Sequence, residues 1–268
     1  MLKVRVLTAF ALLAVLVLCM FFLPGYWPAL MLIVMLVGAF EWANIVGFAS
    51  PLKWLYVAAT LIVAGMMLVM AAPGSTASQL VFALSLLFWL LAAPSWLAQG
   101  WQVKQPYLLA LVGWVVLLPT WLALVHLRDI SPFLLLALMA IVWIADTAAY
   151  FSGKKFGRHK LAPSISPGKT WEGVAGAVVG ATLYAMAWFT TGKLSMTLPW
   201  AIVAVWQLTY FSILGDLFES WMKRQAGVKD SGQIFPGHGG VLDRIDALTS
   251  TLPIVAFVLT IWKTFDTN

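Results

Sequence analysis

Two pairs of carboxylates with the same spacing stand on either side of a glycine-rich segment. Asp216 and Glu219 are three positions apart, and Asp243 and Asp246 repeat that spacing. Residues three apart on a helix share a face, so two helix ends would present four carboxylates to one point. Oxygen ligands without a Cys or His cluster favour Mg²⁺ over Zn²⁺. Ion pairing of these acids with neighbouring Lys and Arg side chains is the structural alternative.

The segment between the two pairs combines cations with glycines. Glycines beside His238 allow the backbone to approach a ligand closely, and the cations around them favour a polyphosphate. His238 has three open roles: an acid or base, a hydrogen-bond donor to phosphate, or a residue that holds the loop. Carboxylates, cations and a glycine-rich loop together predict metal-assisted phosphoryl or nucleotidyl transfer. The cations and glycines concerned are Lys223, Arg224, Lys229, Arg244, Gly237, Gly239 and Gly240.

A second polar segment, residues 146–173, begins with Asp146 and Tyr150. These two residues are four apart and would share a helix face. Asp146 is predicted to bind a metal or a substrate group, with a buried aspartate paired to a loop cation as the alternative. His159 lies among cations and is expected to be solvated or to face lipid rather than to be a ligand.

The rest of this segment resembles a phosphate-binding loop in composition. Small hydroxyls and glycines alternate with cations, so backbone N–H groups can approach an anion. Gly168-Lys169-Thr170 resembles the end of a P-loop, but Pro163 stands where that motif needs a glycine. A basic loop that contacts anionic lipid is the alternative. It leaves unexplained why Ser166, Thr170 and Glu172 gather at the entrance of the next apolar segment.

The elements that position these residues are predicted to be membrane-spanning helices. The chain has 268 residues, of which 62% are hydrophobic and only 10% are charged, whereas a soluble domain carries about 25% charged residues. Nine apolar segments are long enough, or nearly so, to cross about 30 Å of hydrocarbon. The fourth is short, and the first is expected to remain as an uncleaved anchor. The segments are 6–23, 27–47, 54–72, 79–93, 107–127, 132–151, 173–191, 199–219 and 244–263.

The distribution of cations predicts the orientation of these helices. With the N-terminus in the cytoplasm, 13 of the 16 Lys and Arg residues fall on the cytoplasmic side, as the positive-inside rule requires. Eight of the ten acids fall on the same side, which that rule does not demand. The sequence therefore predicts an active site at the cytoplasmic helix ends.

The net charge and the cysteine content limit which partners and cross-links are expected. The net charge of +6 is explained by cytoplasmic loops beside anionic headgroups, so nucleic acid is not an expected partner. The single Cys19 excludes a disulfide within one chain. Residues 1–131 are mostly apolar and residues 132–268 carry nearly all the chemistry. We expect the two parts to form one integral membrane unit. The connection 94–106 is expected to be a loop, with Trp96 and Trp101 at headgroup depth.

The chain resembles a known family, the phosphatidate cytidylyltransferases (CDP-diacylglycerol synthases). The resemblance rests on a long spaced motif, on two shorter ones and on Glu41-Trp42 at the end of the second apolar segment. The long motif reads Ser220-x-Met222-Lys223-Arg224-x4-Lys229-Asp230-x-Gly232-x2-Phe235-Pro236-x-His238-Gly239-Gly240-Val241-x-Asp243-Arg244-Ile245-Asp246. The shorter ones read Asp146-Thr147-x-Ala149-Tyr150 and Ser166-Pro167-x-Lys169-Thr170-x-Glu172-Gly173.

The resemblance implies a reaction and its requirements. CTP and phosphatidate would give CDP-diacylglycerol and pyrophosphate at the bacterial inner membrane. Mg²⁺ would be needed, with K⁺ as a second cation, and the enzyme would be a homodimer surrounded by membrane lipids. Asp216 and Asp243 would bind the metal and Asp246 would complete the site. Lys229 and Arg244 would complete the catalytic set. Substrate would contact Lys223, Arg224, Asp230, His238, Gly239, Gly240, Ser166, Lys169, Thr170 and Asp146.

Two rival functions remain open. A CTP-dependent polyprenol or phytol kinase shares a membrane-embedded acidic core, but the complete motif from Ser220 to Asp246 argues against it. An ion-coupled transporter would also carry intramembrane acids. It would place them near the midplane, whereas these acids gather at one face.

Overall fold

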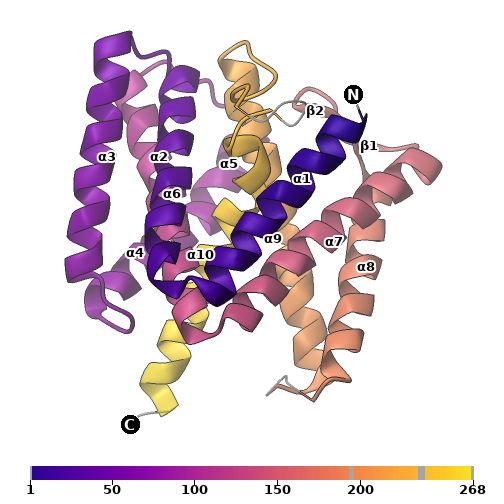
Figure 1. Cartoon of the computed structure of the whole chain (residues 1–268). Coiled ribbons are helices and arrows are strands. Elements are labelled where there is room, and N and C mark those ends of the chain that lie inside the picture. Colours follow the sequence, from indigo (N-terminus) through magenta and orange to yellow (C-terminus); the bar gives the residue numbers. More distant parts are fainter. Residues whose placement is uncertain (1, 193–195, 235–238, 267–268) are drawn as a thin grey trace.

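The computed structural model describes residues 2–192, 196–234 and 239–266. The described residues form a bundle of helices with one small hairpin (Figure 1). The helices are α1 (Leu2–Val17), α2 (Trp27–Val46), α3 (Ser50–Met70), α4 (Thr76–Leu87), α5 (Ala93–Gln99), α6 (Pro106–Ile130), α7 (Pro132–Phe156), α8 (Trp171–Phe189), α9 (Leu198–Gln225) and α10 (Leu242–Asp266). Short π- or 3₁₀-helical turns are η1 (Leu18–Phe22), η2 (Pro24–Tyr26) and η3 (Phe88–Ala92).

Eight helical segments are long and apolar enough to cross a membrane, among the described residues. This confirms an all-α multi-pass membrane protein. The segments are Pro24–Val46, Ser50–Met70, Thr76–Gln99, Pro106–Ile130, Pro132–Phe156, Trp171–Phe189, Leu198–Gln225 and Leu242–Trp262. The first of the nine predicted segments is also helical, but its apolar stretch Phe10–Phe22 is shorter than a full span.

The fourth segment is longer than the sequence indicated. Helix α4 continues through the π-turn η3 into α5, so one helical segment runs from Thr76 to Gln99. The predicted loop 94–106 is therefore wrong in its first half, because Pro94 sits in the first turn of α5, where proline needs no N–H partner. Trp96 is buried and Trp101 is exposed.

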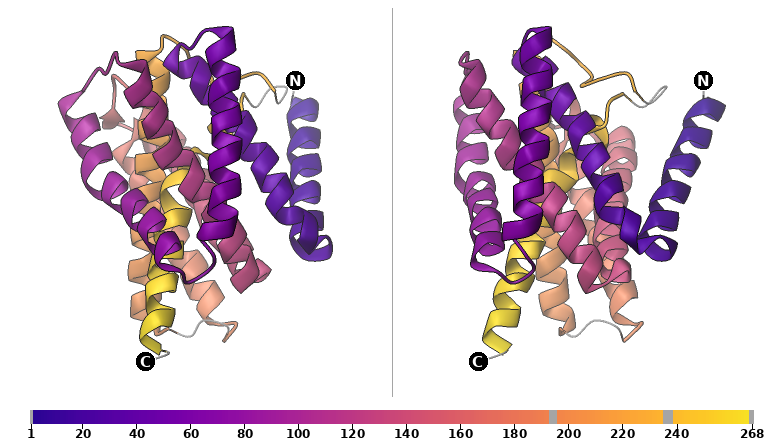
Figure 2. Two further views of the ribbon diagram at one scale, coloured as in Figure 1. Left: turned by 90° about the vertical axis from the view of Figure 1, so that its left-hand side faces the viewer. Right: turned by 60° about the vertical axis from the view of Figure 1, so that its left-hand side comes forward.

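The start of α1 and the end of α10 lie at opposite ends of the bundle (Figures 1 and 2). The antiparallel hairpin of β1 (Lys160–Ala162) and β2 (Ser166–Thr170) lies at the same end as the start of α1. Termini at opposite ends of the bundle are expected when the chain crosses the membrane an odd number of times. They agree with the predicted placement of successive loops on alternate sides. The side of the membrane that each end faces stays a prediction.

Helix α6 forms the centre of the N-terminal part and contacts α2, α3, α4, α7 and α10. Tryptophans of α2 attach to it: Trp42 Nε1 donates to Leu109 O at 2.8 Å, and Trp27 Nε1 donates to Leu124 O at 2.9 Å. A buried indole N–H in an apolar medium needs such an acceptor. These bonds fix α2 against α6, and α2 in turn carries Glu41 toward α10.

Helices α7 and α8 approach each other through small residues. A Cβ added at Gly176 would lie 2.2 Å from Ser152 Oγ, and one at Gly180 would lie 2.8 Å from Ala148 Cβ. Small residues four apart are the usual means by which membrane helices come this close. The contact holds the hairpin, which precedes α8, beside the C-terminal half of α7, where Asp146 lies.

Candidate active site

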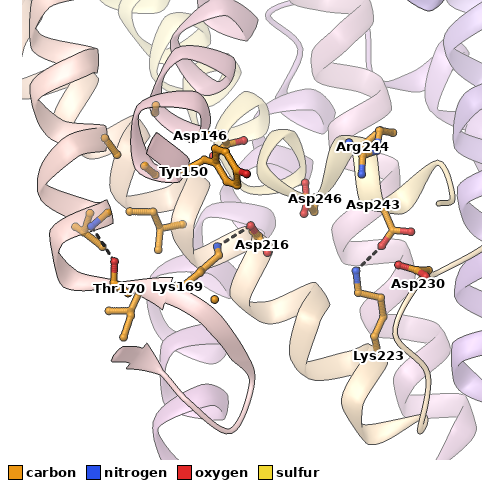
Figure 3. A pocket seen from close by; sticks show the side chains of 18 residues that line it. Asp146, Tyr150, Lys169, Thr170, Asp216, Lys223, Asp230, Asp243, Arg244 and Asp246 are labelled. Atoms are coloured by element: carbon orange, nitrogen blue, oxygen red, sulfur yellow. Dashed lines mark hydrogen bonds and ion pairs between the residues drawn. The ribbon is translucent and has the colours of Figure 1, made fainter. Parts of the chain in front are cut away.

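A cavity of about 430 Å³ opens among α7, the hairpin, α8, α9 and α10, at the bundle end that carries the hairpin. Figure 3 shows Asp146, Tyr150, Lys169 and Asp216 on one side, Lys223, Asp230, Asp243 and Arg244 on the other, and Asp246 between them. The lining brings together two sequence segments that were predicted to form one site. The predicted site residues that line it are Asp146, Lys169, Thr170, Asp216, Lys223, Asp230, Asp243, Arg244 and Asp246.

Asp216 is bound to the hairpin by an ion pair. Lys169 Nζ, on β2, lies 2.6 Å from Asp216 Oδ2, and the two side chains are 24% and 30% exposed. Ser220 Oγ donates to Asp216 Oδ1 at 3.3 Å, which confirms the shared helix face. Because both charged ends remain partly open to the cavity, an incoming phosphate can compete for the lysine.

The position of Lys169 is set by the turn from β2 into α8. Thr170 caps α8, because its Oγ1 accepts a hydrogen bond from Gly173 N at 3.1 Å. Lys160 Nζ donates to Pro167 O at 2.8 Å across the hairpin. His159, exposed as expected, has its Nδ1 2.6 Å from Glu172 Oε1. Each contact ties the hairpin to itself or to the start of α8.

Lys223 occupies a different position from the phosphate contact that the motif implied. Its ammonium lies 3.0 Å from Glu219 Oε1, one helical turn earlier, and also contacts Asp243 Oδ1. All three side chains are less than one-tenth exposed. Lys223 lines the cavity, but its charge is already shared by two carboxylates. Its predicted role in binding phosphate stays a prediction.

Asp243 is held by the backbone as well as by Lys223. Its Oδ2 accepts hydrogen bonds from Gly240 N at 2.9 Å and from Ser231 N and Oγ, both at 3.0 Å. Gly239, which adopts a φ of +80°, leaves no room for a side chain, since a Cβ there would lie 2.5 Å from Asp243 Oδ2. The described part of the glycine-rich loop thus wraps around this aspartate.

Helices α9 and α10 meet at their backbones beside Asp216 and Asp246. A Cβ at Gly215 would lie 2.6 Å from the carbonyl oxygen of Asp246 and 2.5 Å from Ser250 Oγ. Ser250 Oγ donates to Phe211 O at 2.7 Å across the same contact. Gly215 is therefore required where it stands, and it places the two aspartates at adjoining points of the cavity wall.

The four carboxylates do not converge on one point as the spacing predicted. Glu219 is turned to Lys223, and Asp243 has hydrogen bonds on both oxygens. Among the residues that the structure describes, no three Asp, Glu, His or Cys side chains form a group that could hold a metal ion. Asp216 and Asp246 still offer two carboxylates to one cavity. This suits Mg²⁺, which often takes one or two carboxylates and completes its shell with substrate phosphates and water.

Several predicted residues lie outside the cavity lining. Arg224 donates to the carbonyl oxygens of Ile165 (3.3 Å) and Val228 (3.0 Å), so it ties the hairpin and the α9 end together. Lys229 is exposed and Gly240 is buried behind Asp243. His238 lies outside the described residues, together with Phe235, Pro236 and Gly237. The predicted residues absent from the lining are Ser166, Arg224, Lys229, Gly239 and Gly240.

A second cavity, of about 690 Å³, lies among the same four helices, farther from the hairpin end. Its lining is mainly apolar and includes Leu138 of α7, Trp188 near the end of α8, Val205 and Leu208 of α9, and Val258 of α10. On α9 the two linings come within two residues of each other, from Phe211 to Ile213. The polar cavity at the hairpin end thus adjoins an apolar cavity farther along the same helices.

Comparison with known proteins gives one consistent result. A family model described as "Cytidylyltransferase family" matches residues 3–262. A protein of Haemophilus influenzae named phosphatidate cytidylyltransferase is 36% identical, over 96% of this chain and 98% of that protein. One of the same name from Pseudomonas aeruginosa is 39% identical, over 97% of each. One from Bacillus subtilis is 42% identical over 46% of each chain.

Proposed function

Since the chain belongs to the cytidylyltransferase family, a family of nucleotidyltransferases, we propose that it is a phosphatidate cytidylyltransferase. It joins CTP and phosphatidate to give CDP-diacylglycerol and pyrophosphate. The observation that carries the proposal is the cavity in which aspartates and cations from three helices and the hairpin face one another beside an apolar cavity. Charge for a nucleotide and space for a lipid are thereby adjacent.

The reaction exchanges one phosphoanhydride bond for another. An oxygen of the phosphatidate phosphate attacks the α-phosphorus of CTP, and the bond from that phosphorus to the bridging oxygen of the β-phosphate breaks. Pyrophosphate leaves with the bonding electrons. The second pKa of a phosphate monoester is about 6, so the nucleophile is ionised at neutral pH and needs no strong protein base. Positioning and charge neutralisation then supply the catalysis.

Lys169 and Arg244 are the cations best placed to bind the triphosphate. Both line the cavity, and Arg244 is exposed. Without substrate, Lys169 is paired with Asp216. When phosphate binds Lys169 instead, the Asp216 carboxylate becomes available. Lys223 acts differently: its single charge is shared between Asp243 and Glu219.

We propose that Asp216 and Asp246 hold Mg²⁺, which would offset the charge of the triphosphate and of the departing pyrophosphate. Asp243, predicted as a further ligand, would have to exchange one of its hydrogen bonds to bind the ion. Its described contacts make it the residue that fixes the start of α10 beside the site. The chain's own part in metal binding is thus two carboxylates on adjoining helices, of which Asp216 would first have to exchange its ion pair with Lys169.

The apolar cavity supports a lipid acceptor. It lies among α7, α8, α9 and α10, directly along the helices from the polar cavity. An acyl chain that entered sideways from the bilayer would occupy it while the lipid phosphate reached the polar cavity. We propose the bacterial inner membrane as the location, because the matched relatives are bacterial. The homodimer stays a prediction.

The test is an assay of the purified protein with labelled CTP and phosphatidate in mixed micelles, with and without Mg²⁺. We expect labelled CDP-diacylglycerol and pyrophosphate only when Mg²⁺ is present, and little product from Lys169→Met. A phosphorylated alcohol formed from a polyprenol would favour the kinase instead. Absence of CDP-diacylglycerol from folded protein under all conditions would refute the proposal.

A further inference from the structure

Glu41 is a buried acid that the proposed mechanism does not use. It lies on α2, in the N-terminal part of the chain, and the residue is only 1% exposed. A carboxylate in such a position is costly unless its oxygens are hydrogen-bonded. Its neighbours on α2 are apolar, including Trp42 and Ala43, which are also buried. The partners of Glu41 therefore come from another part of the chain.

Those partners lie at the start of α10, 200 residues farther along the chain. Val241 N donates to Glu41 Oε1 at 3.0 Å, and Leu242 N donates to Oε2 at 2.9 Å. The first amides of a helix lack partners within the helix and form its positive end. Glu41 supplies both hydrogen-bond acceptors and the opposite charge, so α2 caps α10 from outside.

Glu41 is also connected to Asp243 through one hydroxyl. Ser231 Oγ lies 2.9 Å from Glu41 Oε2 and 3.0 Å from Asp243 Oδ2. A serine hydroxyl has a single proton, so it cannot donate fully to both carboxylates at once. Ser231 is buried and links the two acids directly. A shift of Glu41 would therefore be passed to the aspartate at the cavity wall.

Two glycines of the long motif stand against Glu41. A Cβ at Gly232 would lie 2.4 Å from Glu41 Oε1, and a Cβ at Gly240 would lie 2.4 Å from the same oxygen. Any side chain at either position would displace the carboxylate. Gly240, for which the sequence suggested contact with a phosphate ligand, and Gly232 are both accounted for by the approach of an internal carboxylate.

We propose that Glu41 is a positioning residue, which holds Ser231 and the start of α10 so that Asp243 stays fixed at the cavity. The inference rests on the proposed function for its kinetic readout. Glu41 does not touch the cavity lining and acts only through Ser231 and the amides of Val241 and Leu242. Its effect should appear in turnover rather than in CTP binding.

The test replaces Glu41 by glutamine, which keeps the volume but turns one acceptor oxygen into an NH₂ group. We expect kcat to fall about 10- to 100-fold, the usual effect of removing a group that orients a site residue, while the KM for CTP stays nearly constant. In a Ser231→Ala background the same replacement should cost less, because the link to Asp243 is already broken. An unchanged kcat per folded enzyme would overturn the proposal.

Trp42→Phe is the matched control. Trp42 is the next residue on α2 and is equally buried. Its replacement by phenylalanine removes one hydrogen bond, the one that Trp42 Nε1 donates to Leu109 O. That bond points to α6 rather than α10. We expect this variant to be less stable but to keep the kcat of the wild type. An equal loss of kcat in both variants would mean that any damage to α2 lowers activity, and it would overturn a specific role for Glu41.

Hydrogen exchange gives a readout independent of activity. The amides of Val241 and Leu242 should exchange faster in Glu41→Gln than in the wild type or in Trp42→Phe. Unchanged exchange at both amides would overturn the proposed capping. If the wild type forms no CDP-diacylglycerol, the proposed function fails, and the exchange experiment alone decides whether Glu41 holds α10.

Discussion

Replacing Lys223 by methionine would remove the cation that lies between Glu219 and Asp243. Methionine keeps an unbranched side chain of similar length, so the change is chiefly one of charge. The lysine and its two carboxylate partners are 9%, 7% and 8% exposed, so solvent cannot replace the lost attraction. Breaking a buried charge pair costs about 3–5 kcal/mol. For a chain of this size that corresponds to a fall in Tm of about 6–20 °C.

The assay is the loss of monodisperse protein in detergent as temperature rises. Lys169→Met is the control, because its ion pair with Asp216 is 24% and 30% exposed and an open pair contributes at most about 1 kcal/mol. Adding Glu219→Gln to Lys223→Met should recover part of the lost Tm, since a neutral amide then replaces one of the two buried carboxylates. Equal Tm values for Lys223→Met and Lys169→Met would refute the reasoning.

Four further outcomes are expected. Asp243→Asn should abolish turnover in correctly inserted protein, measured by CDP-diacylglycerol formation, whereas near-normal activity would contradict its role; His238→Ala should lose less in the same assay, because an ionised phosphate needs no strong base. Val205→Trp, which fills the apolar cavity, should lower activity on long-chain phosphatidate more than on short-chain phosphatidate, and equal losses would argue against an acyl-chain site. Reporter fusions should place the C-terminus outside the cytoplasm, and a cytoplasmic signal would make the number of crossings even.

The membrane helices were predictable because their signal is local. A run of apolar residues long enough to cross the bilayer identifies itself, and eight such runs are confirmed. The fourth was cut short at Pro94, which reads as a break in a helix. The π-turn at Phe88–Ala92 changes that reading, since the helix continues through it and proline fits the first turn of α5 that follows.

The site was predictable as a set of residues but not as a set of contacts. The sequence correctly brought Asp146, Lys169, Asp216 and Asp246 to one cavity. It could not tell which cation pairs with which acid. Lys223 is i+4 from Glu219, a spacing that suggests an ion pair as readily as a phosphate contact, and only burial decides between them.

The contact of Glu41 with α10 could not be read from one sequence. Its partners are about 200 positions away, and no local pattern reports such a distance. The only available signal was a lone acid within an apolar helix. That signal predicts that a partner exists, but it does not identify the partner.

The same contact has a consequence for how the protein is made. Helix α2 is synthesised long before α10, and about 200 residues at 5–20 residues per second take about 10–40 s. During that time Glu41 stands at one end of a membrane helix without the amides that later bind it. Helix α10 also contacts α4, α6 and α9, so its arrival closes the N-terminal and C-terminal parts together. The cavity wall that Asp243, Arg244 and Asp246 supply is therefore completed only after the last helix of the described chain has been made.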